Sequence, residues 1–130
     1  MRIEHTGLQV AEPRNMAGWY SRHLGFRVAR QQDVQPWTTF LSEESGHGML
    51  EIYNNPAAPL PDYGNQDPLV LHIAFDVGDE DAAAVRDRLL AAGATVARDV
   101  VTTAAGDRLI MLRDPWGLAI QLVQRKEELA

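Results

Sequence analysis

The chain has 130 residues, 45% of them hydrophobic and 23% charged, which is typical of one globular domain with a single core. Its formal net charge is -6 and it has no run of Lys or Arg, so nucleic acids and anionic membranes are not expected as partners. No segment approaches the roughly 20 apolar residues of a membrane span, and the N-terminus lacks the apolar core of a secretion signal, so a cytoplasmic location is expected. The chain contains no Cys, and any metal ion must therefore be held by nitrogen and oxygen ligands.

The first half of the chain predicts a strand, a helix and three further strands. The helix is expected at about 13–24, because Pro13 suits a first turn, Met16, Tyr20 and Leu24 recur every four residues, and Gly25 suits the end. The strands are expected near 2–10, 26–32, 36–42 and 48–54. This order is βαβββ.

The second half predicts the same order of elements. A helix at about 79–92 has Asp79 as its expected cap and Gly93 as its stop. Its expected apolar face comprises Ala82, Val85, Leu89 and Ala92. Strands are expected near 69–77, 94–100, 106–113 and 118–124. Residues 55–68 are rich in Pro and turn residues and are expected to form a linker, and the charged tail, 125–130, is expected to fray or to form a short helix.

A sequence repeat connects the two halves. The segment His5-Thr6-Gly7-Leu8-Gln9-Val10 aligns with His72-Ile73-Ala74-Phe75-Asp76-Val77. Further along, once extra residues in the loops of the second half are allowed for, Met49-Leu50-Glu51-Ile52-Tyr53 aligns with Ala119-Ile120-Gln121-Leu122-Val123. His5 therefore corresponds to His72, and Glu51 corresponds to Gln121.

These four polar residues share the faces of their strands that lie opposite the apolar faces. Side chains alternate along a strand, so Glu51 lies opposite Leu50 and Ile52, and Gln121 lies opposite Ile120 and Leu122. If both halves turn these faces toward one axis, two imidazoles, a carboxylate and an amide oxygen converge, which suits a divalent ion. The alternative is that each His is a hydrogen-bonded core residue and that Glu51 and Gln121 lie at a rim.

The quoted segments, together with Trp19-Tyr20-x-x-x-Leu24-Gly25-Phe26 and Asp114-Pro115-Trp116-Gly117, resemble the vicinal oxygen chelate superfamily of glyoxalases, bleomycin resistance proteins and dioxygenases. Within it the chain is most similar to bacterial glyoxalase I, or lactoylglutathione lyase. The resemblance implies an α+β fold in which two βαβββ modules form an open, eight-stranded, barrel-like sheet. One domain would then span 1–130, with a first module at about 2–54, a linker at 55–68 and a second module at 69–124.

The resemblance also implies a site and an activity. The metal ligands would be His5, Glu51, His72 and Gln121 around one divalent Ni, Zn, Co, Mn or Fe ion. The chain would be a lyase or isomerase that acts on a small substrate with vicinal oxygens through a metal-stabilised enediolate. Glu51 would be the catalytic base, because the amide of Gln121 cannot take up a proton. A homodimer with the site at its interface is expected.

One departure from bacterial glyoxalase I concerns the substrate. That enzyme usually has an Arg where this chain has Gln9, and its glutathione contacts are not evident here, so glutathione hemithioacetal is not the expected substrate. Arg108 or Asp107 either contacts a polar or anionic substrate group or belongs to the surface.

Two other functions stay open on the sequence. His5, His72 and Glu51 match the two-His, one-carboxylate composition of non-haem iron dioxygenases. A drug-binding resistance protein of the bleomycin type would use the same fold without chemistry, although such proteins generally lack the ligand set.

Overall fold

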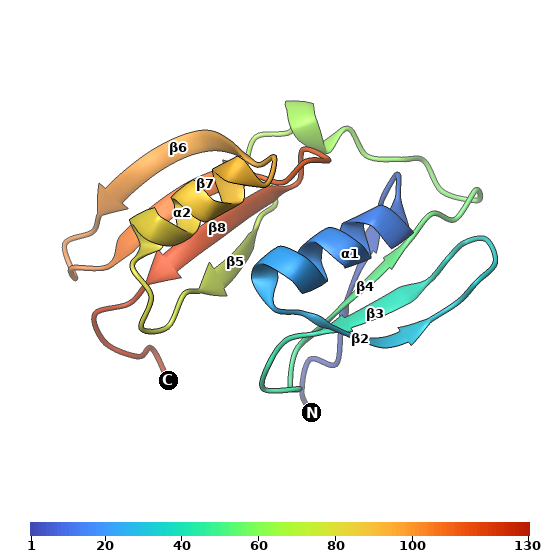
Figure 1. Cartoon of the computed structure of the whole chain (residues 1–130), viewed down its shortest axis with the longest axis horizontal. Helices are drawn as coiled ribbons and strands as arrows, with labels where there is room; N and C mark the ends of the chain where they lie inside the picture. Colours follow the sequence, from blue (N-terminus) through green and yellow to red (C-terminus); the bar gives the residue numbers. More distant parts are fainter. The chain divides into compact units, whose positions relative to one another are not determined.

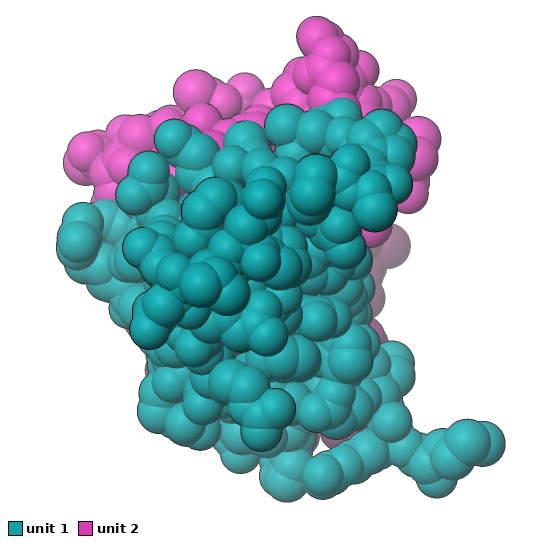
Figure 2. Space-filling view, turned by 90° about the vertical axis from the view of Figure 1, so that its right-hand side faces the viewer, with its two compact units in different colours: residues 1–61 teal, residues 62–130 magenta.

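The computed structural model describes all residues, 1–130. The chain divides into two compact units, residues 1–61 (unit 1) and residues 62–130 (unit 2), which Figure 2 colours separately. Pro61 ends unit 1, so the stretch predicted as a linker contributes its first part to unit 1 and its last part to unit 2.

Unit 1 has one helix and a four-stranded mixed sheet (Figure 1). Its elements are β1 (Thr6–Gln9), α1 (Pro13–Leu24), β2 (Arg27–Gln31), β3 (Thr39–Ser42) and β4 (Met49–Tyr53). The strand order is β1-β4-β3-β2, with β1 parallel to β4 and the other pairs antiparallel. The parallel pairing places Gly7 beside Glu51.

Unit 2 repeats this topology. It has a 3-10 turn, η1 (Tyr63–Asn65), and then β5 (Ile73–Asp76), α2 (Ala82–Ala91), β6 (Thr95–Thr102), β7 (Arg108–Arg113) and β8 (Ala119–Gln124). The order β5-β8-β7-β6 matches unit 1, and the parallel pairing of β5 with β8 places Ala74 beside Gln121. The predicted α+β fold of two βαβββ modules is confirmed, and the sequence alignment of Glu51 with Gln121 corresponds to the same register position.

Helix α1 follows its prediction at both ends. Pro13 occupies the first turn, where a missing N–H costs nothing, and Gly25 ends the helix at φ 74° with its N–H donating to the Tyr20 carbonyl. Met16 and Tyr20 are fully buried, and the helix packs on the sheet face that carries Leu41 and Ile52. This apolar packing leaves the opposite face of the sheet to His5 and Glu51.

Helix α2 begins later than predicted. Asp81 caps it by accepting a hydrogen bond from the Ala84 N–H at 3.3 Å, so the prediction of Asp79 as the cap is wrong. The reason is a turn before the helix, in which Gly78 has φ 61° and the Glu80 N–H donates to the Val77 carbonyl. The predicted apolar face is otherwise confirmed, because Ala82, Val85 and Leu89 are buried.

Strands β1 and β5, the first of each unit, are shorter than predicted. Expected at 2–10 and 69–77, they form only at Thr6–Gln9 and Ile73–Asp76, where each strand pairs four residues with its parallel neighbour.

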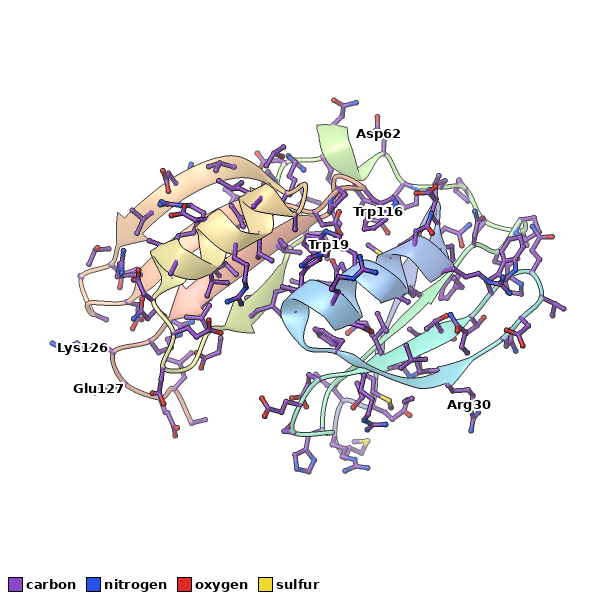
Figure 3. All side chains as sticks on the ribbon, in the orientation of Figure 1. Trp19, Arg30, Asp62, Trp116, Lys126 and Glu127 are labelled. Atoms are coloured by element: carbon purple, nitrogen blue, oxygen red, sulfur yellow. The ribbon has the colours of Figure 1, made fainter.

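The tail forms no helix, because the Lys126 N–H and the Arg125 guanidinium both hydrogen bond to the buried Asp107 carboxylate. The side chains of Lys126 and Glu127 extend outward from this tail (Figure 3). Neither helix has the length and apolar character that crossing a membrane requires.

A tight turn at Asp114–Gly117 sets the start of β8. The buried Asp114 carboxylate accepts hydrogen bonds from the Trp116 and Leu118 N–H groups at 2.9 and 3.0 Å. Arg113 fixes the turn from the other side by donating to the carbonyls of Gly117 and Tyr63. This turn places Gln121 on one face of the sheet and the buried Ile120 and Leu122 on the other.

Candidate functional site

In unit 1 the structure brings His5 and Glu51 together. His5 immediately precedes β1, Glu51 lies in the middle of β4, and the His5 Nε2 atom is 3.1 Å from Glu51 Oε2. The Glu51 side chain is 24% exposed, so the carboxylate is partly desolvated and the imidazole satisfies it. Two of the four predicted ligands therefore lie in contact within unit 1.

Glu4 and Phe40 fix the ring of His5. The Glu4 carboxylate hydrogen bonds to Nδ1, and the Phe40 ring meets the imidazole edge to face at 5.5 Å between centroids. The hydrogen bond that His5 donates to Glu4 raises the pKa of His5, and the charge of Glu51 adds to that rise. Sequence reasoning missed Glu4, although its position directly before the candidate ligand was the available signal.

Because Gly7 in β1 has no side chain, two polar side chains of β4 approach the β1 backbone at this point. A Cβ atom at Gly7 would lie 3.2 Å from the Tyr53 hydroxyl and 3.4 Å from Glu51 Oε2. Both polar atoms therefore lie over the same point of the β1 backbone. Tyr53 lies two residues after Glu51 in β4 and shares its face.

In unit 2, His72 has an oxygen atom close to Nδ1, as His5 has in unit 1. Its Nδ1 atom lies 2.9 Å from the Pro68 carbonyl oxygen, which can only accept, so Nδ1 carries the proton. In the neutral ring, Nε2 is then the unprotonated nitrogen, which is the form that a metal ligand requires. Pro68 lies in the predicted linker, where nothing in the sequence indicated this contact.

Gln121 lines a cavity of about 330 Å³ in unit 2. Its neighbours there are mostly apolar and come from β6, β7 and the segment before His72: Ala97, Val101, Leu109, Met111, Pro68 and Leu69. Arg98 and Asp67 supply the charged part of the lining. No hydrogen bond within the chain engages the Gln121 carboxamide, which is half-buried and open to a ligand.

The donor chemistry fits a divalent ion, but each unit supplies only part of the set. Neither unit by itself gathers three His, Asp or Glu side chains into one group. Unit 1 presents an imidazole and a carboxylate, and unit 2 presents an imidazole and a free carboxamide. Both imidazoles have Nδ1 occupied by an oxygen acceptor, as His ligands of metals usually do. Convergence of all four residues stays a prediction.

Gln9 has a structural role where an Arg was expected for glutathione recognition. Its side-chain amide donates to the carbonyls of Asn55 and Ala58 at 2.7 and 3.0 Å, and its Oε1 accepts from the Asn55 N–H at 2.8 Å. The residue is 9% exposed. Gln9 therefore holds the backbone that follows β4.

Arg108 and Asp107 are engaged with other parts of unit 2. Arg108 forms an ion pair with the helix-capping Asp81, and Asp107 binds the tail through Arg125 and Lys126. The hydrogen bond from Arg108 lowers the pKa of Asp81. These ion pairs favour structural roles over substrate contact, for Arg108 at the surface and for Asp107 as a buried anchor of the tail.

A family model for the Glyoxalase/Bleomycin resistance protein/Dioxygenase superfamily matches residues 2–122. No curated protein sequence matches the chain. A glyoxalase family protein from Bacillus cereus has a similar structure, with a TM-score of 0.79, 20% identity and coverage of 95% of this chain and 93% of that one.

Two further solved structures share the fold. TnmS3, an antibiotic binding protein from Streptomyces sp., has a TM-score of 0.72 at 19% identity, and 97% of each chain is covered. A mutant of glyoxalase I from Zea mays has a TM-score of 0.75 at 21% identity, with 97% of this chain and 46% of that chain covered. The family match over nearly the whole chain and the repeated βαβββ topology agree, and the chain belongs to the Glyoxalase/Bleomycin resistance protein/Dioxygenase superfamily.

Proposed function

We propose that the chain is a metal-dependent lyase or isomerase related to glyoxalase I, which moves a proton between adjacent carbons of a small substrate with vicinal oxygens. His5, Glu51, His72 and Gln121 would hold one divalent ion. When bound, this ion supplies Lewis-acid stabilisation of negative charge on the substrate oxygens. Ni, Zn, Co, Mn and Fe all accept such a set of nitrogen and oxygen ligands.

The observation that carries the proposal is the matched state of the two histidines. In each, an oxygen acceptor occupies Nδ1, namely the Glu4 carboxylate for His5 and the Pro68 carbonyl for His72. The two acceptors are unrelated, since Glu4 is adjacent to His5 and Pro68 lies four residues before His72, yet both leave Nε2 as the ring nitrogen available to a further ligand. This matched contact at Nδ1 supports a ligand role for both histidines.

The two oxygen ligands differ in what they can do. Glu51 is a carboxylate that can take a proton from a substrate carbon and return it to the next one, whereas the Gln121 carboxamide can only coordinate or hydrogen bond. The proposed proton transfer is thus confined to the substrate face beside unit 1. The engagement of Gln9 with Asn55 and Ala58 supports a substrate other than glutathione hemithioacetal.

Because each unit supplies two of the four ligands, a complete site requires a unit 1 and a unit 2, from one chain or from two copies. A homodimer with the site at its interface is part of the proposal, as is a cytoplasmic location. The partner is a small-molecule substrate, and no nucleic acid or membrane partner is proposed.

Metal binding by purified protein tests the proposal directly. Apo protein titrated with Ni(II), Co(II), Mn(II) or Zn(II) is expected to bind one ion per site and to gain thermal stability, since a ligand that binds only the folded state stabilises it. The variants His5→Ala and His72→Ala should each lose most of this gain. His23→Ala, which changes a helix residue outside the proposed set, is the matched control. A wild-type protein that gains no stability from any of these ions would refute the proposal.

The Glu51→Gln variant separates coordination from catalysis. It converts the unit 1 oxygen ligand into the amide already present in unit 2, so metal binding should weaken only modestly while turnover of any substrate found should be lost. Screening 2-oxoaldehydes, hydroxyacids and acyl thioesters for proton exchange with deuterated water provides the assay. Retained exchange in Glu51→Gln would exclude Glu51 as the base.

A drug-binding function is the second candidate, and the cavity in unit 2 favours it. Its lining is mainly apolar, and an antibiotic binding protein from Streptomyces sp. shares the fold. This function predicts that an apolar aromatic drug of a size that suits this cavity binds the metal-free protein, and that His72→Ala leaves that binding unchanged. Uptake of oxygen with Fe(II) and a catechol would instead indicate a dioxygenase.

A further inference from the structure

We propose that Tyr53 is a substrate-contacting hydrogen-bond donor that acts beside Glu51. This inference rests on the proposed function, because it assigns the hydroxyl to an oxygen atom of the substrate whose proton Glu51 moves. It identifies a chemical group outside the four-residue ligand set and predicts an oxygen acceptor on the part of the substrate that lies over Gly7.

The position of the hydroxyl carries the first step of the argument. Tyr53 and Glu51 share one face of β4, and both direct polar atoms to the point where a Cβ atom of Gly7 would stand, at 3.2 Å for the hydroxyl and 3.4 Å for Oε2. The aromatic stem of Tyr53 is half-buried. The phenol is therefore held next to the carboxylate that is proposed to act as the base.

The repeat provides a second, independent observation. At corresponding positions, unit 1 has Gly7 and Tyr53, whereas unit 2 has Ala74 and Val123. In unit 2 the smaller Val123 occurs together with Ala74, which has a Cβ atom. In unit 1 the larger Tyr53 occurs together with Gly7, which has none. The fold thus accepts an aliphatic side chain at this place, and the tyrosine together with its glycine is particular to the unit that carries the carboxylate.

The hydroxyl is also unoccupied by the rest of the chain. No hydrogen bond joins it to Glu51 or to any other group, and it is not one of the buried polar atoms that lack a partner. The hydroxyl is therefore accessible from outside the fold. The O–H group of Tyr53 can therefore donate to an acceptor outside the chain.

The chemistry assigned to Tyr53 is hydrogen bonding without proton loss. When Glu51 takes a proton from a substrate carbon, negative charge develops on the neighbouring oxygen, and the Tyr53 O–H can donate to that oxygen. The phenol keeps its proton, and the proton held by Glu51 returns to the adjacent carbon. A hydrogen bond to such a charged acceptor is stronger than one to a neutral oxygen.

The test uses acetohydroxamic acid, which carries two neighbouring oxygens and one negative charge when it chelates a metal. The full chain is loaded with Co(II), and hydroxamate binding is followed by the visible absorption of the ion. Tyr53→Phe is expected to weaken hydroxamate binding about tenfold, while the affinity for Co(II) and the melting temperature stay at the wild-type values. Gly7→Ala should weaken hydroxamate binding as well, because its Cβ crowds both polar atoms. Tyr63→Phe makes the same chemical change in unit 2 and should leave hydroxamate binding unchanged.

The possible failures are distinguishable. If Tyr53→Phe binds Co(II) and hydroxamate as the wild type does, Tyr53 is not a donor and only this inference is overturned. If the variant loses Co(II) itself, Tyr53 supports or ligates the metal, which also overturns the inference. A wild-type protein that binds no Co(II) would overturn the proposed function and the inference together.

Discussion

The His5 imidazole lies against the Glu51 carboxylate, with Nε2 3.1 Å from Oε2, although His5 precedes β1 and Glu51 lies in β4. The parallel register of β1 with β4 makes this contact possible, because it places the start of β1 beside the middle of β4. Protonation of the imidazole favours this ion pair, because it gives the ring a positive charge. A divalent cation would use the same two atoms as ligands, so metal and proton compete for one place.

Glu4 should strengthen metal binding without touching the metal. Its carboxylate accepts a hydrogen bond from Nδ1 of His5. The negative charge of this carboxylate makes the Nε2 lone pair more basic and therefore a stronger metal ligand. Glu4→Gln keeps a hydrogen-bond acceptor but removes the charge, so we expect the affinity for Co(II) or Ni(II) to fall roughly tenfold. Competition with a chromophoric chelator measures this, and Glu128→Gln in the tail serves as the control. Equal affinity in Glu4→Gln and wild type would mean that Glu4 does not tune the ligand.

Gln9 should stabilise unit 1 through its clamp on the chain after β4. Gln9→Glu removes the amide donor to the carbonyls of Asn55 and Ala58 and places a carboxylate against them, so we expect a loss of about 2–3 kcal/mol in the free energy of unfolding. Gln9→Ala, which leaves the same carbonyls unpaired without a charge, should cost less. Urea unfolding followed by tryptophan fluorescence gives both values. A Gln9→Glu protein as stable as Gln9→Ala would show that the carbonyls do not face the side chain in solution.

The sequence was sufficient for elements whose ends carry their own signals. Pro13 and Gly25 mark both ends of α1, and that helix has its predicted bounds. Before α2, the sequence predicted Asp79 as the cap, and the turn at Gly78 moves the cap to Asp81, which no periodicity predicts.

The sequence likewise predicted some features of the candidate site and not others. The repeat predicted the faces of Glu51 and Gln121, because side-chain alternation along a strand is a local property. The contacts of Glu4 and Pro68 with the histidines, and the approach of Tyr53 to Gly7, depend on strand register and on the path of a loop. These are consequences of tertiary structure that a single sequence does not encode locally.

Glu43 should make stability depend on pH in the acidic range. Its carboxylate accepts hydrogen bonds from the Ser45 hydroxyl and from the N–H groups of Ser45, His47 and Gly48 in the β3–β4 loop. These bonds lower its pKa from 4.5 to about 2. Because the folded pKa is depressed, the stabilisation is complete above pH 4.5 and is lost as the pH falls toward 2.

The variant Glu43→Gln isolates this effect. Its amide cannot accept all of these hydrogen bonds, so its melting temperature should lie below that of the wild type at pH 7, and the difference should narrow steadily between pH 5 and pH 2. Glu44→Gln changes an exposed neighbour in the same loop and should show no such trend. A gap between wild type and Glu43→Gln that is constant with pH would contradict the assignment.

Gly117 is the position where the turn before β8 should tolerate substitution least. Its φ of 88° is unfavourable for any residue with a side chain, and a Cβ atom would lie 2.8 Å from the backbone Cα and N of Gly64. Because that obstacle is backbone, the η1 segment itself would have to move, with the Arg113 contacts that bind it. We expect Gly117→Ala to cost roughly 3 kcal/mol or more in the free energy of unfolding, combining backbone strain with overpacking.

Gly25→Ala provides the matched control, since Gly25 has a similar φ of 74° but no atom within 4 Å of its Cβ position. That variant should lose only the conformational part, about 1–2 kcal/mol. Urea denaturation of both proteins measures the difference, which reports the contact between Gly117 and Gly64. The displaced turn should also shift Gln121, so Gly117→Ala is expected to weaken Co(II) binding, whereas Gly25→Ala is not. Equal losses of stability in the two variants would mean that the η1 backbone does not press on the turn.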